Sequence, residues 1–326
     1  MKYVLVLLVM GCLMSCSSGE KKAELELKVL EDQSSVEVWM DEELFTSYRF
    51  EKQLHKPVLY PIFAPGGILV TRGFPLEPRS SERVDHPHHV GLWLNFGDVN
   101  GFDFWNNSSA VTEVKKGAYG RIVHRELIRA ETLDGKGYLE VEMDWIAPDT
   151  DQAEILLSEQ TSYVFHAVEN IRVIDRFTRL TAVADQVVFT DNKEGMLAIR
   201  VDRAFELPSD RPVRLTDESG NPREEAQLDN EGVSGWYRNS GGFEGEEVWG
   251  KRALWVKLGG KKEGQDVSMA LMDHPDNAGF PACWHARAYG LFSINNLGSK
   301  VFNEDYDLQT LSLSKGEVLT FRHRFV

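Results

Sequence analysis

The sequence predicts an all-β protein, a large antiparallel β-sandwich that forms one domain. Apolar and polar residues alternate with a period of two in many short runs, turn residues separate these runs, and no stretch sustains a helical apolar repeat. Alternation of this kind is typical of antiparallel sheets with one face toward water. Many strands without a helical layer indicate two sheets packed face to face.

The alternating runs extend along most of the chain. Leu139, Val141, Met143 and Trp145 alternate with polar or aromatic neighbours, so one face of this strand is apolar. Turn residues follow or precede such runs, as at 134–137 and 259–260. The same pattern predicts strands at 24–30, 35–40, 121–129, 160–168, 171–180, 197–201, 253–258, 267–272, 289–294 and 318–325.

Residues 204–250 interrupt this pattern. The segment is rich in Asp, Glu, Asn, Gly and Pro, and it contains Trp236, Tyr237 and Trp249. A loop of this length in a compact domain is usually functional or disordered. Its aromatic residues favour an ordered loop.

The first residues predict an export signal and a lipid anchor. Lys2 precedes an apolar run over residues 4–14, and Cys16 follows small residues, which is typical of a bacterial lipoprotein signal peptide. We expect residues 1–16 to be the signal, Cys16 to carry the lipid, residues 17–23 to be a tether and 24–326 to form the domain. The protein would then contact a membrane through its lipid alone, in the periplasm or at the cell surface.

The charge balance excludes one class of partner. The formal net charge is -15, and binding of nucleic-acid phosphates requires clustered Lys and Arg. The sequence leaves the oligomeric state open.

Two Asp-His-Pro tripeptides are the strongest functional signal. The first, Asp85-His86-Pro87, continues into His88 and His89, and the second, Asp273-His274-Pro275, precedes Trp284-His285 and Tyr289. Imidazole gains and loses a proton near neutral pH more readily than any other side chain. We expect the two segments to meet in one pocket.

Three interpretations of these segments compete. His86 and His88 with a third ligand could bind a divalent metal. Alternatively, histidine and Glu194 could exchange protons with a polyol while Arg200 stabilises negative charge and aromatic rings stack on a sugar. In the third interpretation the tripeptides are turns whose side chains satisfy local backbone groups.

The acid–base interpretation defines the candidate site. Its expected catalytic residues are His86, His88, Glu194, His274 and His285. Its expected substrate-binding residues are His89, Trp93, Trp105, Arg200, Asp273, Asn277, Trp284 and Tyr289. We expect no organic cofactor, and a divalent metal is the alternative.

Several motifs along the mature chain carry a resemblance to a known family. They lie at residues 85–89, 101–105, 193–195, 199–201, 245–250, 273–275 and 284–291. Together they resemble a bacterial family labelled methane oxygenase PmoA-like, whose members are common as lipoproteins or secreted proteins of glycan-degrading bacteria. The methane monooxygenase subunit of that name is a bundle of membrane-spanning helices, whereas this chain has no spanning segment after its signal.

The resemblance implies a β-supersandwich similar to galactose mutarotases. In mutarotase-like sites a histidine protonates the ring oxygen and a glutamate takes the anomeric proton. Glu194, Arg200 and the two histidine segments are the residues here that match such roles.

The sequence therefore favours a lipid-anchored, exported carbohydrate-active enzyme, a hydrolase, lyase or epimerase that uses His and carboxylate acid–base chemistry. The alternatives are a glycan-binding lipoprotein without catalysis and a metal-dependent hydrolase.

Overall fold

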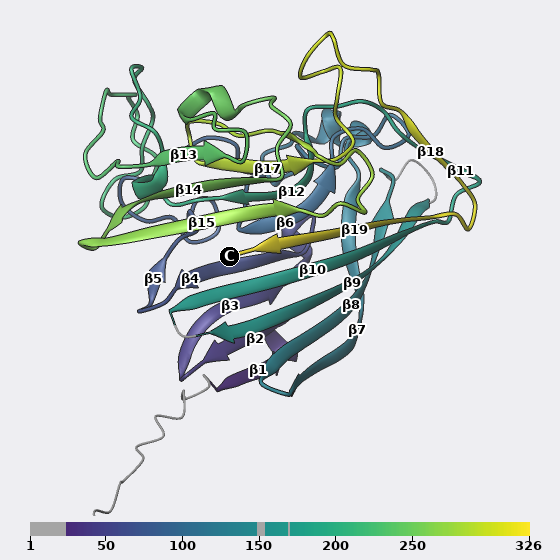
Figure 1. Cartoon of the computed structure of the whole chain (residues 1–326), viewed down its shortest axis with the longest axis horizontal. Coiled ribbons are helices and arrows are strands. Elements are labelled where there is room, and N and C mark those ends of the chain that lie inside the picture. Colours follow the sequence, from purple (N-terminus) through teal and green to yellow (C-terminus); the bar gives the residue numbers. More distant parts are fainter. Residues whose placement is uncertain (1–23, 149–153, 169) are drawn as a thin grey trace, which may run out of the picture.

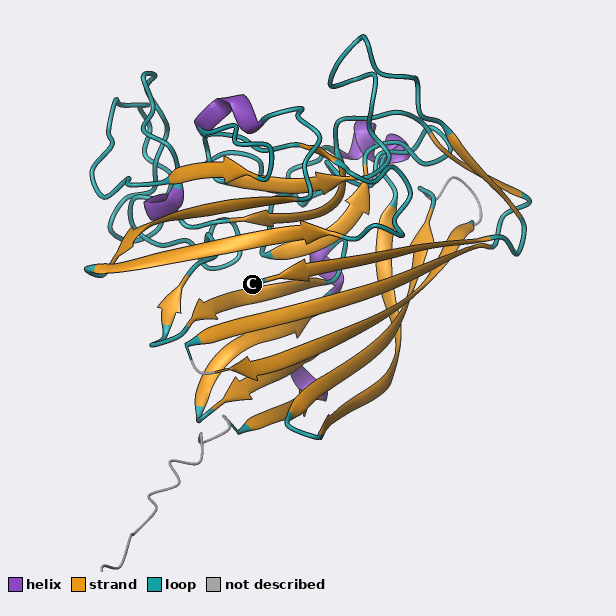
Figure 2. Cartoon of the chain, viewed as in Figure 1, coloured by secondary structure: helices purple, strands orange, loops and turns teal. Residues whose placement is uncertain are grey.

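The computed structural model describes residues 24–148, 154–168 and 170–326. The predicted signal peptide, Cys16 and the tether at 17–23 lie outside the described residues. Strands form most of the regular structure, and the helices are short 3-10 turns (Figure 2).

The first sheet has nine strands and contains most of the N-terminal part of the chain. Its order is β1-β2-β3-β4-β6-β12-β17-β16, with β5 paired to β4, and all pairs are antiparallel. The strands are β1 (Leu25–Leu30), β2 (Ser35–Met40), β3 (Glu43–Arg49), β4 (Val58–Ala64), β5 (Ile68–Leu69), β6 (Leu92–Phe96), β12 (Gly195–Arg200), β16 (Cys283–Trp284) and β17 (Leu291–Asn295).

The second sheet has eight strands in the order β13-β14-β15-β19-β10-β9-β8-β7. The C-terminal strand β19 lies between β15 and β10 and joins the two halves of this sheet (Figure 1). The strands are β7 (Arg121–Leu133), β8 (Lys136–Ile146), β9 (Ile155–Val168), β10 (Ile171–Ala182), β13 (Trp236–Asn239), β14 (Trp255–Lys262), β15 (Gln265–Asp273) and β19 (Val318–Phe325).

The remaining elements are small. Strands β11 (Gln186–Phe189) and β18 (Leu311–Ser314) pair with each other. The 3-10 turns are η1 (Glu31–Gln33), η2 (Lys52–Leu54), η3 (Glu113–Ala118), η4 (Arg203–Phe205) and η5 (Gly245–Val248). Of the described helices, none is long and apolar enough to cross a membrane.

One apolar core lies between the two large sheets. Val36, Val38 and Phe96 come to it from the nine-stranded sheet, and Val141 and Phe325 come from the eight-stranded sheet. Each of these side chains is buried because alternate residues of a strand point to the same face. The predicted all-β antiparallel sandwich is confirmed.

Three central strands of the first sheet are buried on both faces. Every residue of β6, β12 and β17 is buried. Trp93, Ala198 and Leu291 belong to a second apolar cluster, whereas their strand neighbours pack in the main core. Loops therefore cover the outer face of these strands, and the candidate site lies among those loops.

The predicted long loop at 204–250 is largely irregular but ordered. It contains η5 and the short strand β13, which pairs with β14. Long loops gather along the upper side of the view in Figure 2.

Candidate functional site

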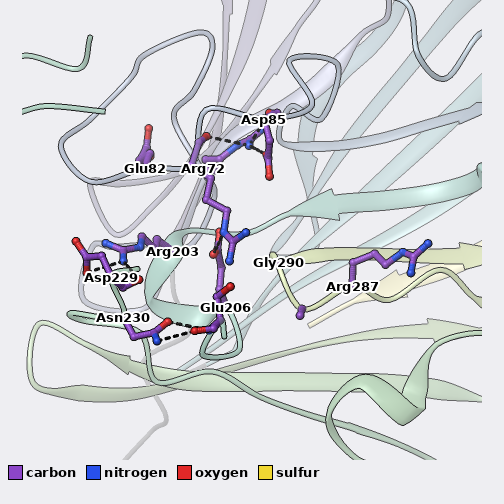
Figure 3. Close-up of polar contacts among 12 residues, drawn as sticks. Arg72, Glu82, Asp85, Arg203, Glu206, Asp229, Asn230, Arg287 and Gly290 are labelled. Carbon is purple, nitrogen blue, oxygen red and sulfur yellow. Dashed lines mark hydrogen bonds and ion pairs between the residues drawn. The ribbon is translucent and has the colours of Figure 1, made fainter. Parts of the chain in front are cut away.

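A buried arginine shapes the first histidine segment, which lies in the loop between β5 and β6. Arg72 Nη1 donates to Asp85 Oδ1 (2.6 Å) and to the Asp85 carbonyl (2.9 Å). Arg72 Nη2 donates to the carbonyls of His86 and His89, each at 3.0 Å. Figure 3 shows Arg72 joined to Asp85 in this way. One guanidinium thus orders the backbone of the whole tripeptide region.

Asp85 links this loop to the end of β12. Arg200 Nη2 lies 2.8 Å from Asp85 Oδ1, Arg200 Nη1 lies 3.4 Å from His89 Nδ1, and the Arg200 guanidinium lies over the Tyr289 ring. Burial tends to raise the pKa of Asp85, but Arg200, the His86 ring and Arg72 together hold that pKa well below its usual range. Asp85 is therefore a carboxylate whose role is to hold two arginines.

The imidazoles stack on one another and on aromatic rings. The ring centroids of His86 and His89 lie 4.8 Å apart with nearly parallel planes, and His86 stacks on Tyr289, also at 4.8 Å. His89 also stacks on Trp93 and meets His88 edge to face. His86 has φ of +41°, a left-handed conformation that is uncommon for histidine.

Stacked rings do not converge on one point as metal ligands do. Across the ranges 24–148, 154–168 and 170–326, no group of three or more His, Cys, Asp or Glu is arranged to hold a metal ion.

The inner imidazoles are neutral and incompletely hydrogen-bonded. Burial, followed by nearby cations such as Lys56, lowers the pKa of His88 to about 2. Burial and the neighbouring His88 and Arg200 hold the pKa of His89 far below its usual value. In the described part of the chain, the Nε2 atoms of His88 and His89 are buried and have no hydrogen-bond partner. Such atoms are uncommon in proteins and favour a site for a polar ligand or ordered water.

The second histidine segment contributes His285 and Tyr289 from the loop between β16 and β17. The His285 ring stacks against Trp105 at 6.1 Å, and its Nε2 accepts from Arg287 Nε at 3.2 Å. Burial, Arg287 and Lys193 lower the pKa of His285 to about 3. The Lys193 backbone approaches the ring and opposes part of this shift, although no hydrogen bond of ordinary geometry joins them.

Tyr237 of β13 holds this loop in place. Its hydroxyl lies 3.0 Å from the Arg287 carbonyl, to which it can donate, and it accepts from the Gly290 N–H at 3.1 Å. Gly290 has φ of +82°, and a Cβ there would meet Val201 at 3.0 Å. The turn that presents Tyr289 therefore requires glycine.

Glu194 is the carboxylate beside the aromatic rings. Its Oε2 accepts from Asn106 Nδ2 and its Oε1 from Lys193 Nζ, both at 2.6 Å. Asp103 positions Asn106 by accepting from its backbone and side-chain nitrogens. Glu194 and Arg287 both influence the pKa of Tyr289, which burial raises, so both charges lie near the Tyr289 hydroxyl.

A second buried carboxyl lies beneath the site. Glu206 Oε2 accepts from Arg83 Nε at 2.5 Å, and its Oε1 lies 3.7 Å from Arg200 Nη2. Burial raises the pKa of Glu206 to about 7, although Arg200 and Arg83 act in the opposite direction. Figure 3 shows Glu206 close to Gly290, with the separate Arg203–Asp229 pair beside it.

The structure therefore brings together most of the predicted site, and we call this group the histidine cluster. Its members are His86, His88, His89, Trp93, Trp105, Glu194, Arg200, His285 and Tyr289.

The expectation that both tripeptides meet in one pocket needs correction. Asp273 closes β15 in the eight-stranded sheet, and the chain crosses to the other sheet only at β16. Asp273 accepts from Asn277 Nδ2, and Asn277 also bonds to the backbone of Arg322. His274 is 41% exposed beside Asp276. These three residues form a turn anchored to β19, outside the histidine cluster.

Trp284, Trp93 and Arg200 are completely buried, as are the other predicted binding residues Trp105 and His89. Trp284 points into the main core, opposite to His285, because successive strand residues face opposite sides, and its Nε1 donates to the Ala253 carbonyl. Trp93 is covered by His89 and donates to Asn95. Arg200 is fully buried and is paired with Asp85. These side chains lie beneath the loops of the site and are not exposed at its surface.

Sequence reasoning missed several residues that organise the site. They are Lys56, Arg72, Arg83, Asn106, Glu206 and Tyr237. Glu206 carried a local signal, because it is a charged residue between the apolar residues Phe205 and Leu207. Lys56 donates to the His88 carbonyl at 2.7 Å, and burial lowers its pKa to about 7.

The fold and the site define an all-β sandwich protein with a loop-built cluster of histidines, arginines and aromatic residues. Residues 35–326 match the model of DUF6807, described as a family of unknown function. The chain belongs to the DUF6807 family. This description makes no reference to methane oxygenases, and no curated protein matches the chain significantly.

Solved structures show distant similarity. A galactose mutarotase-like protein from Clostridium acetobutylicum has 11% identity and a TM-score of 0.36, covering 94% of this chain and 98% of the other. A putative aldose 1-epimerase from Escherichia coli K12 has 11% identity and a TM-score of 0.28, with 93% and 98% covered. The GH36 alpha-galactosidase AgaB from Geobacillus stearothermophilus has 13% identity and a TM-score of 0.38, with 92% and 40% covered.

The coverage of the galactosidases is partial. The chain spans 41% of the galactosidase domain of AgaSK and 40% of AgaB. With TM-scores below 0.5, these similarities carry no conclusion about activity.

Proposed function

We propose that this protein is a carbohydrate-active enzyme whose site is the histidine cluster. The observation that supports this best is that Glu194, partly exposed His86 and Tyr289 lie beside buried imidazoles. In the described part of the chain, the Nε2 atoms of His88 and His89 have no hydrogen-bond partner. Aromatic faces stack on the C–H faces of sugars. Neutral imidazoles donate and accept hydrogen bonds, as sugar hydroxyls do.

The proposed roles follow from burial and charge. Glu194 acts as the base, and His86, the imidazole of the cluster in contact with solvent, exchanges the second proton. His88 and His285 stay neutral at pH 7 because their pKa values lie far below that pH, so they orient substrate oxygens. The reaction class is hydrolysis, elimination or epimerisation.

A glycan panel with single variants tests this proposal. Products and anomeric exchange would be followed by chromatography and NMR. Glu194→Gln and His86→Ala should each lower the rate by about 10²- to 10⁴-fold, the usual size of general acid–base effects. His274→Ala is the matched control, because His274 belongs to the same tripeptide motif but lies outside the cluster. Full activity in both cluster variants, or an equal loss in the control, would contradict the assignment.

A glycan-binding protein without catalysis is the second candidate. Both Glu194 oxygens already accept hydrogen bonds, which favours a carboxylate that positions neighbours over one that takes a proton. No product from any glycan with the wild-type protein, together with sugar binding that persists in the Glu194→Gln variant, would support this candidate.

The proposed location is a membrane surface outside the cytoplasm, with the lipid on Cys16. Cys16→Ser should move the protein from the membrane fraction to the soluble exported fraction; retention in the membrane fraction would contradict it.

A further inference from the structure

Arg287 is a guanidinium held from two sides beside the histidine cluster. Its Nε donates to His285 Nε2 at 3.2 Å, and its guanidinium carbon lies 5.0 Å from the centre of the Trp249 ring. The side chain is half-buried. These contacts fix the plane of the guanidinium without using its two terminal nitrogens.

The terminal nitrogens of Arg287 have no acceptor within residues 24–148, 154–168 and 170–326. Arg72, Arg83 and Arg200 each pair with Asp85 or Glu206, whereas no described carboxylate pairs with Arg287. Figure 3 shows Arg287 extending away from Asp85 and Glu206, with no dashed line to either. A planar fork of this kind matches the geometry of a carboxylate.

The two side chains that hold Arg287 each carry an unused donor. Because His285 Nε2 accepts from Arg287, the proton of the neutral ring is on Nδ1. His285 is 3% exposed; the Lys193 backbone approaches the ring, but Nδ1 makes no hydrogen bond of ordinary geometry in the described structure. The Trp249 Nε1 is likewise buried and without a partner there. Three neighbouring side chains therefore offer N–H donors and no acceptor.

The charge around this place favours an anion. Burial lowers the pKa of His285, and the cations Arg287 and Lys193 lower it further. Glu194 lies on the other side, near Tyr289. A carboxylate of a ligand gains from these cations.

We propose that the histidine cluster selects sugars that carry a carboxylate, and that Arg287 binds this carboxylate through its terminal nitrogens. This inference rests on the proposed function and names the substrate class of the same site. The neutral part of the sugar would lie beside Tyr289, near Glu194.

Matched pairs of acidic and neutral sugars test the inference by calorimetry. The probes are methyl glucuronide with methyl glucoside, methyl galacturonide with methyl galactoside, and oligogalacturonate with its methyl ester. In at least one pair the acid should bind about tenfold or more tightly, as expected for hydrogen bonds to a charged group. Added salt should weaken binding of the acid and leave the neutral partner unaffected.

Variants separate Arg287 from a general charge effect. Arg287→Gln should weaken binding of the acid about tenfold to a hundredfold and leave binding of the neutral sugar unchanged. Arg287→Lys should recover only part of the loss, because it keeps the charge without the fork. Arg179→Gln is the charge-matched control, since Arg179 is exposed on β10, in the other sheet. Circular dichroism would confirm that each variant is folded.

The outcomes distinguish this inference from the proposed function. Equal affinity for acid and neutral sugars, or an equal loss of both in Arg287→Gln, would overturn the inference and leave the carbohydrate site standing. Tighter binding of a sulfated sugar than of the uronide would overturn the carboxylate assignment. No binding of any sugar would overturn both.

Discussion

At the scale of single residues, burial and ion pairs with arginines act in opposite directions on the pKa values of the buried carboxyls of the site. Asp85 is shared by Arg72 and Arg200 and stays ionised. Glu206 faces Arg83 and Arg200, but burial outweighs their effect on its pKa. The pKa values of the two carboxyls are therefore shifted in opposite directions, although Arg200 contacts both.

Glu206 predicts a loss of stability as pH rises. Its pKa is about 7 in the folded protein against an ordinary value of 4.5, so between these pH values the folded state retains a proton that the unfolded state has lost. The free energy of unfolding, relative to Glu206→Gln, should fall by about 3 kcal/mol between pH 4.5 and pH 8. Urea unfolding across this range measures it, and a difference that stays constant with pH would refute it.

At the scale of elements, three strands buried on both faces carry the site. β6, β12 and β17 present one face to the inter-sheet core and the other to the loops. The loop between β16 and β17 is fixed by Tyr237, which comes from the other sheet through β13. Both sheets therefore contribute to the position of the histidine cluster.

Removal of one hydroxyl tests this dependence. Tyr237→Phe leaves the Gly290 N–H without its hydrogen bond to the Tyr237 hydroxyl and should lower the free energy of unfolding by about 1–3 kcal/mol. Sugar affinity should fall as well, because Tyr289 and Arg287 belong to the same turn. Tyr138→Phe on β8 is the control, since no hydrogen bond of its hydroxyl is present in the described structure. Equal stability of the two variants in thermal unfolding would contradict the role of Tyr237.

The strands could be predicted better than the site. Runs with strict alternation, such as Leu139 to Trp145, keep one polar face and are visible in the sequence. β6 gives a weaker signal, because Trp93 and Asn95 are buried beneath loops that only the tertiary structure supplies. A strand covered on both sides loses its alternating pattern.

Residues of the site could be predicted from their local sequence where they lie beside strands of one sheet. His86, Glu194 and His285 come from loops next to neighbouring strands and could be predicted as a group. His274 could not be separated from them, since the change of sheet between β15 and β16 leaves no sequence signal. Glu206 requires knowledge of which arginines lie opposite, and that is a long-range property.

At the scale of the whole molecule, an ion pair is buried in the body of the sandwich. Arg176 Nη2 donates to Glu159 Oε1 at 2.6 Å, and Trp145 Nε1 donates to Glu159 Oε2 at 2.7 Å. Both charged side chains are almost inaccessible to water. Each charge is tolerated there only because the other is present.

This pairing predicts strong coupling between the two positions. Glu159→Ala leaves Arg176 without its carboxylate and should lower the free energy of unfolding by about 3–5 kcal/mol. The double variant Glu159→Leu with Arg176→Met removes both charges and should be less destabilised than the single variant. Chemical denaturation of all three proteins measures the coupling. A double variant at least as destabilised as the single variant would show that the pair is not coupled.

The order of strands in the first sheet also sets the reach of the proposed lipid anchor. β1 lies at one end of that sheet, and Arg200 closes β12, five strand pairings away. At about 4.8 Å per pairing this places the two about 24 Å apart. An acyl chain attached ahead of β1 would thus lie at the far end of the sheet from the loops of the histidine cluster.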